Sequence, residues 1–190
     1  ACLDRTLPDL IDTESRQLQV ILAPLFNDVE NSQRARISAA LEDFQGTDEP
    51  LMQLQMLDCS IAPDGAGMLQ QLAKTRALSR DILRTTGADV LVWGEVSPDA
   101  QRLDLLTTYP VGADRGLFDI DQISLPADFD ADHAALLAAK VWLSSDVTAK
   151  LDTELIAAGM QNTVDRLSPL TENAAASWSE QQQGTLYHSV

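Results

Sequence analysis

Residues 87–96 read Gly-Ala-Asp-Val-Leu-Val-Trp-Gly-Glu-Val, and this stretch decides the fold of the 190-residue chain. Gly87 stands where a long amphipathic helix pattern ends, and a nearly continuous apolar run follows at once. The run is too short to span a membrane and is rich in valine, which predicts a strand covered on both faces. We expect it to be the third and central strand of a sheet.

Two βα units precede this strand. Residues 18–26 predict a first strand, followed by a polar loop and a helix that stops at Gly46. Residues 51–58 predict a second strand, in which Gln53 and Gln55 make one face half polar and favour a place near the sheet edge. Apolar residues at helical spacing predict a second helix over 67–86.

After the central strand, the pattern predicts an antiparallel return and then helices. Residues 102–109 alternate as a hairpin partner, and residues 117–125 predict an edge strand. Alanine-rich helical sequence follows, with Pro169 between two expected helices at 147–167 and 171–190. The sequence thus predicts an α/β fold: a small three-layer domain with a β-α-β-α-β parallel core extended by an antiparallel hairpin, followed by a helical C-terminal segment.

This pattern divides the chain into three parts. Residues 1–16 are expected to form a linker or docking arm, and residues 17–130 the α/β domain. Residues 131–190 are expected to form a helical segment that could begin a tetratricopeptide-like array, since the two expected helices together span close to one repeat unit.

Charge limits the partners that the chain can bind. The sequence has 13 basic and 29 acidic residues, a formal net charge of −16. Such a field repels the phosphates of nucleic acids and anionic lipids, so we expect no nucleic-acid partner. Because no apolar run approaches the roughly 20 residues of a membrane span, we also expect no membrane-spanning segment.

The two cysteines are too few for a disulfide framework or a metal site. Cys59 follows the second expected strand and is interpreted as a small buried hydrophobe. Cys2, after Ala1, could be the remnant of a bacterial lipoprotein cleavage site or an incidental result of where the sequence begins. The compartment therefore stays open between the bacterial cytoplasm and the periplasmic side of the envelope.

The sequence offers no cluster of catalytic residues. His133 and His188 are the only histidines, and neither lies near a recognisable nucleophile turn. Glu95 could act as an acid at its strand end, but a glutamate there more often faces solvent or pairs with an arginine. We therefore expect no enzyme activity, no metal and no cofactor.

Two groups of residues are candidates for binding. Carboxyl ends of parallel strands gather at one sheet edge, where a small molecule or nucleotide could be sensed. The residues expected there are Asn27, Asp28, Ser60, Gly65 and Gly67. The glycine pair lacks the third glycine of a dinucleotide fingerprint and is more typical of a flexible loop with a helix cap.

The second group is a basic stripe on the helix 67–86. Arg76, Arg80 and Arg84 recur at every fourth position and so share one face of the helix. A stripe of this kind is usually a solvated face, but in so acidic a chain it could dock an acidic segment of a partner or of the chain itself.

The order of elements resembles the TolB N-terminal-like domain, which precedes tetratricopeptide repeats in bacterial proteins. Residues 20–27, Val-Ile-Leu-Ala-Pro-Leu-Phe-Asn, are similar to that family's opening strand, although the order Ala23-Pro24-Leu25 departs from its usual Leu-Pro-Phe. Residues 86–96 and the return at 102–105 are similar to its later strand pair. The resemblance covers roughly residues 17–150.

The resemblance implies a non-enzymatic protein-interaction or scaffold module, the N-terminal part of a larger bacterial helical-repeat protein. Its partner would be another protein or the chain's own downstream repeats, and self-association into a homo-oligomer is left open. The alternative function, from a different class, is the small-molecule or nucleotide sensor at the strand ends.

Overall fold

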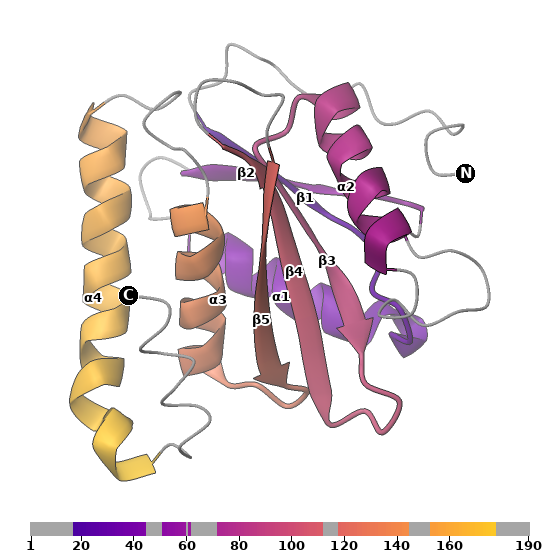
Figure 1. Cartoon of the computed structure of the whole chain (residues 1–190). Coiled ribbons are helices and arrows are strands. Elements are labelled where there is room, and N and C mark those ends of the chain that lie inside the picture. Colours follow the sequence, from indigo (N-terminus) through magenta and orange to yellow (C-terminus); the bar gives the residue numbers. More distant parts are fainter. Residues whose placement is uncertain are drawn as a thin grey trace.

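The computed structural model describes residues 17–44, 51–59, 61, 72–111, 118–144 and 153–177. Their strands form a five-stranded sheet in the order β2-β1-β3-β4-β5 (Figure 1). Three strands are parallel: β1 (Leu18–Leu22), β2 (Met52–Met56) and β3 (Val90–Val96). Two continue the sheet antiparallel: β4 (Arg102–Pro110) and β5 (Phe118–Pro126). The predicted parallel core, the antiparallel extension and the central place of the third strand are confirmed.

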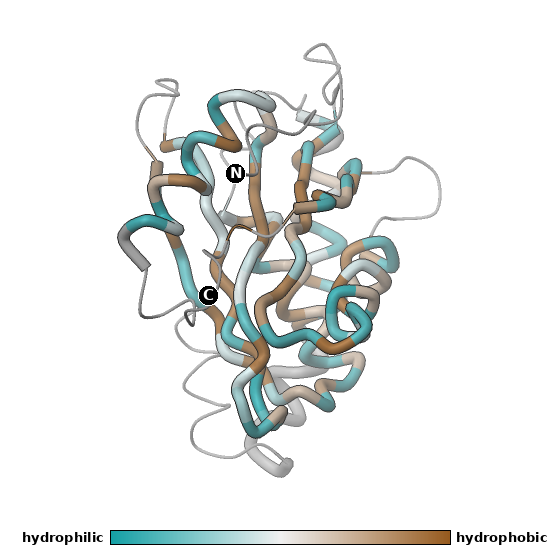
Figure 2. The backbone as a smooth tube through the Cα atoms, turned by 90° about the vertical axis from the view of Figure 1, so that its right-hand side faces the viewer, coloured by the Kyte–Doolittle hydropathy of each residue, from teal (hydrophilic) through white to brown (hydrophobic). Residues whose placement is uncertain are grey.

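Helices lie on both faces of this sheet (Figure 1). Their bounds are α1 (Ser32–Asp43, after the short 3-10 turn Val29–Asn31), α2 (Leu72–Thr86), α3 (Ala131–Ser144) and α4 (Thr153–Ser177). Helices α1 and α3 share one hydrophobic cluster with the sheet, and α2 shares the other. Hydrophobic residues recur along the strands that these helices cover (Figure 2).

The central strand β3 is buried along all seven of its residues. Val90 and Val92 belong to the cluster under α1 and α3, and Leu91 and Trp93 belong to the cluster under α2. A strand with both faces covered gains from an unbroken apolar sequence, because neither set of alternating side chains meets water. This is why the run at 90–93 carries no polar residue.

Gly94 marks a close approach between β3 and β4. It pairs in register with Leu105, and a Cβ atom built on Gly94 would lie 2.2 Å from the carbonyl oxygen of Asp104 and 2.9 Å from the Cα of Leu105. The backbone of β4 therefore occupies the space that any other side chain would need.

Helix α4 differs from the expected pair of helices, because it runs unbroken from Thr153 to Ser177 through Pro169. A proline removes one backbone hydrogen bond and can bend a helix without ending it, so Pro169 is a weaker boundary signal than we expected. The helix packs on α3 through Gly159, where a Cβ would lie 2.1 Å from the ring of Trp142. Side chains of α4 also bind the end of α1, since Arg166 and Asn162 donate to the carbonyls of Asp43 and Phe44, respectively.

Cys59 corrects one expectation. It packs against the hydrophobic cluster under α2, as expected for a small hydrophobe, but it is only half-buried and it is disulfide-bonded. The other cysteine of the sequence, Cys2, lies outside the described residues, as does the expected linker 1–16. A count of two cysteines cannot distinguish a free thiol from one bridge, because pairing depends on which residues the fold brings within about 7 Å.

Candidate functional site

The carboxyl ends of β1, β2 and β3 meet at one sheet edge, where Asn27 and Asp28 were expected to bind a ligand. The Asn27 side-chain amide donates to the carbonyl of Val96 over 3.3 Å. The Asp28 carboxylate accepts the amides of Gln33 (3.0 Å) and Arg34 (2.8 Å), which caps the start of α1. Both side chains are thus held by the protein's own backbone at the predicted edge.

The other three expected ligand residues, Ser60, Gly65 and Gly67, lie outside the described residues. The structure therefore brings two of the five predicted residues to the strand ends and leaves the ligand itself a prediction.

Arg34 is a buried cation at the same edge that we did not single out from the sequence. Its side chain reaches from α1 to the carboxyl ends of β1 and β2. There Nη2 donates to the carbonyls of Leu22 (3.0 Å) and Leu57 (2.6 Å). Burial lowers the pKa of Arg34, and the negative charges of Asp58 and Asp28 act against that shift. The sequence did carry a signal that Arg34 is buried, because position 34 shares a helical face with the apolar positions 37 and 41.

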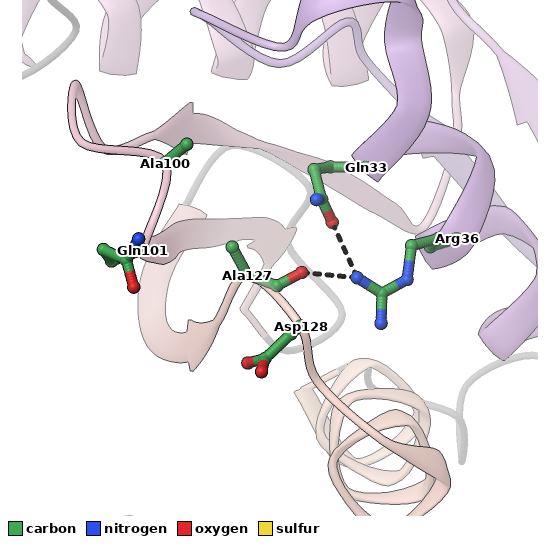
Figure 3. A pocket seen from close by; sticks show the side chains of 6 residues that line it. All are labelled: Gln33, Arg36, Ala100, Gln101, Ala127 and Asp128. Carbon is green, nitrogen blue, oxygen red and sulfur yellow. Dashed lines mark hydrogen bonds between the residues drawn. The ribbon is translucent and has the colours of Figure 1, made fainter.

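A pocket of about 390 Å³ opens beside this edge, between α1, the β3–β4 turn and the segment after β5 (Figure 3). It is lined by Gln33, Arg36, Ala100, Gln101, Ala127 and Asp128. The size suits a small molecule.

The cation of this pocket is already bound by the protein. The Arg36 guanidinium donates to the carbonyl of Ala127, and its Nη1 donates to Gln33 Oε1 over 3.3 Å (Figure 3). The same guanidinium donates to the carbonyl of Phe129. It also lies 4.3 Å from the centre of the Phe129 ring. Arg36 therefore ties α1 to the segment between β5 and α3, and the other polar residues that line the pocket are Gln33, Gln101 and Asp128.

The arginine stripe lies on α2, exposed as expected. Arg84 pairs with Asp81 (Nη1 to Oδ1, 2.7 Å), and its guanidinium lies 5.7 Å from the ring centre of Phe118. Arg76 and Arg80 are exposed, and neither forms an ion pair within the described part of the chain. The stripe thus contains two free cations and one that is already paired.

A chain of buried hydrogen bonds fixes α2 on the sheet. The Trp93 indole donates to Thr108 Oγ1 (2.8 Å), the Thr108 hydroxyl donates to Ser79 Oγ (3.0 Å), and Ser79 donates to the carbonyl of Arg76 (2.9 Å). Satisfied buried networks hold one packing arrangement in preference to others. The inner face of α2 is therefore anchored, and its outer, arginine-bearing face is presented in a fixed orientation.

Two carboxylates face each other on β3 and β4. Glu95 is 8% exposed and lies opposite Asp104 in register. Asp104 accepts the Ser124 hydroxyl over 2.6 Å and the Nε of Arg102 over 3.0 Å. The sequence had suggested that Glu95 faces solvent or pairs with an arginine, but Glu95 is buried and the nearby Arg102 pairs with Asp104.

Tyr109, Asp121 and Lys140 form a further polar cluster under α3. The Tyr109 hydroxyl donates to Asp121 Oδ2 (3.2 Å), and Lys140 Nζ lies 3.1 Å from the same oxygen. Burial, together with the charges of Asp121 and Asp119, raises the pKa of Tyr109 to about 12. A phenol with this pKa stays protonated at neutral pH, so it donates a hydrogen bond and does not serve as a base.

This cluster predicts a loss of stability at high pH. The unfolded chain ionises its tyrosines near pH 10, whereas folded Tyr109 ionises about two pH units later. The contribution of Tyr109 to the free energy of unfolding is therefore fully present below about pH 10 and is lost as the pH rises from about 10 to about 12. Absorbance near 295 nm should show a late phenolate step that Tyr109→Phe removes and Tyr187→Phe leaves in place; ionisation of Tyr109 near pH 10 would contradict the cluster.

No protein-family model matches this sequence, and a search of curated proteins finds no match. Within the described ranges, no helix has the length and apolar character needed to cross a membrane. The same residues contain no group of three or more side chains placed to hold a metal ion. The fold and the site geometry define a mixed α/β protein, and the resemblance to the TolB N-terminal-like domain stays a prediction.

Proposed function

We propose that this chain is a non-enzymatic protein-interaction module whose docking surface is the outer face of α2, here called the arginine face and defined by Arg76 and Arg80. One observation carries the proposal: both guanidinium groups are exposed and form no ion pair in the described part of a chain of net charge −16. The partner is an acidic protein segment.

The spacing of the two arginines suits such a partner. Residues four apart on a helix lie about 6 Å from each other, so two guanidinium groups can each take one carboxylate of an extended or helical acidic segment. The excess of acidic over basic residues in the chain repels that segment elsewhere, so the field of the protein favours approach at this face. The anchored inner face of α2 removes part of the ordering cost of binding.

The strand ends give little support to a ligand site. Asn27, Asp28 and Arg34 all bond to the backbone of the protein there, so they serve the fold. The sensor function is the second proposal, and the pocket beside Gln33 and Asp128 is the observation that favours it. It has less support, because the pocket's arginine is already occupied by carbonyl groups.

The wider setting is also proposed. The TolB-like order of elements supports a place ahead of helical repeats in a larger bacterial protein, with the interaction module at its N-terminal side. The disulfide bond of Cys59 supports the periplasmic side of the envelope over the cytoplasm, because disulfides persist in oxidising compartments.

Fluorescence anisotropy with a labelled glutamate-rich peptide tests the arginine face. We expect saturable binding at low salt that weakens as salt rises, and about a tenfold loss of affinity in Arg76→Gln/Arg80→Gln, since each exposed contact contributes up to about 1 kcal/mol. The matched control is Ala35→Glu/Gln122→Glu, which changes net charge by the same amount at exposed positions elsewhere. Equal losses in both variants would mean that only net charge matters, and the proposal would fail.

A further inference from the structure

The outer edge of β2 is an unpaired strand edge within the described residues, because β2 ends the sheet and pairs only with β1 (Figure 1). Two hydrogen bonds orient the strand: the Leu18 amide donates to the Leu51 carbonyl, and the Leu57 amide donates to the Leu22 carbonyl, both over 3.0 Å. Since backbone groups alternate in direction along a strand, the odd positions face β1. The outward N–H and C=O groups belong to Met52, Leu54 and Met56.

The two ends of the sheet differ in charge. The other end strand, β5, carries Asp119 and Asp121, and charged side chains of this kind discourage strand pairing. β2 reads Met-Gln-Leu-Gln-Met and carries no charge at all. Its last residue, Met56, is 39% exposed, and Leu54 is half-buried, so apolar surface lies uncovered along this edge. In a chain of net charge −16, β2 is an edge that a second copy can approach without placing acidic groups directly opposite one another.

The sequence of β2 is also the same in both directions, which matters for pairing with itself. In an antiparallel pair centred on Leu54, Met52 meets Met56 of the second copy, Gln53 meets Gln55, and Leu54 meets Leu54. Apolar side chains then lie beside apolar ones on the α1 face, and amides lie beside amides on the α2 face. The same centre aligns all the outward backbone groups, giving six hydrogen bonds between the strands.

We infer that this protein self-associates through β2, forming a two-fold dimer in which the two sheets join edge to edge as one continuous sheet. The partner is a second copy of this chain, and the surface is distinct from the arginine face on α2. The net charge of −16 on each copy opposes the dimer, so added salt strengthens it by screening that repulsion.

Cysteine cross-linking tests the register. Only a residue on the two-fold axis meets its own copy, so Leu54→Cys should form a disulfide-linked dimer on mild oxidation, because paired Cα atoms lie about 5.5 Å apart. Gln53→Cys is the matched control, since the same position in two copies would lie about 8 Å apart, too far for a disulfide. Equal cross-linking of both variants, or none of Leu54→Cys at concentrations where the protein is dimeric, would overturn the inference.

Sedimentation of the full chain gives an independent readout. Raising NaCl from about 50 mM to about 500 mM should increase the dimer fraction. Gln53→Lys/Gln55→Lys places like charges opposite each other in the dimer and should weaken association about tenfold or more, with circular dichroism confirming the fold. The control Gln101→Lys/Gln122→Lys lowers the net negative charge equally and should dimerise at least as well as wild type. A monomer under all conditions, or equal weakening in both variants, would refute the β2 interface.

Discussion

Replacing Gly94 by alanine should remove about 3 kcal/mol or more of unfolding free energy, a large share of the 5 to 15 kcal/mol typical of a domain. The added methyl carbon would lie 2.2 Å from the Asp104 carbonyl oxygen and 2.9 Å from the Leu105 Cα. Both atoms are backbone, so no side chain can rotate away and the β3–β4 pair must separate. Because β3 is the central strand, that separation disturbs both hydrophobic clusters.

Gly87→Ala is the comparison for this prediction. Gly87 has a φ of 72°, where alanine is strained by about 1 to 2 kcal/mol, but the cost is local to the end of α2. Urea unfolding followed by the fluorescence of Trp93 and Trp142, which are both fully buried, measures the two variants. A Gly94→Ala variant that is no less stable than Gly87→Ala would show that β4 can move away from β3 at little cost.

Arg34→Met should cost about 2 to 3 kcal/mol. Methionine keeps the apolar stem of the side chain but leaves the Leu57 carbonyl without the 2.6 Å hydrogen bond of the guanidinium, and removes one of the bonds to Leu22. An acceptor left unpaired in a buried place costs about 1 to 3 kcal/mol, and hydrogen bonds to a charged donor are the stronger ones. Relief of the buried charge returns part of this cost, which keeps the loss below that of Gly94→Ala.

The control for Arg34 is Arg84→Met on the outside of α2. The Arg84 side chain is 60% exposed and its ion pair with Asp81 is solvated, so we expect a change within about 0.5 kcal/mol. Denaturant unfolding of both variants separates a general effect of losing an arginine from the bridging role of Arg34. If the two variants lose the same stability, Arg34 does not hold the ends of β1 and β2 together.

Secondary structure could be predicted closely where local pattern and tertiary environment agree. The apolar run at 90–93 predicts a strand covered on both faces, and β3 is buried throughout. The alternation at 102–109 places the hairpin strand correctly but does not reveal its burial, because residues 103–108 of β4 are buried on both faces. Pro169 misled the prediction, because the loss of a single backbone hydrogen bond does not end a long helix. Gly159 gave no warning of its contact with Trp142, since the two residues belong to different helices.

The candidate sites were harder to predict, because bonding depends on distant residues. The stripe spacing correctly indicated an exposed basic face, but which arginine is paired depends on Asp81 and Phe118. Asn27 and Asp28 were expected at the strand ends and lie there, bonded to backbone groups that no sequence pattern identifies. Arg36 reaches carbonyls more than ninety positions away, at Ala127 and Phe129.

The sequence by itself determined the order along the chain of the five strands and of the two helices between the parallel strands, the central strand and its burial, and the strongly acidic charge, because these follow from local periodicity and composition. Only the tertiary structure decided which polar groups already have a partner within the protein and which are available to bind another molecule. That decision rests on pairings between residues far apart in the chain, such as Arg34 with Leu57 and Trp93 with Thr108. The free edge of β2 is of the same kind, since a strand becomes an edge only when the whole sheet has been assembled.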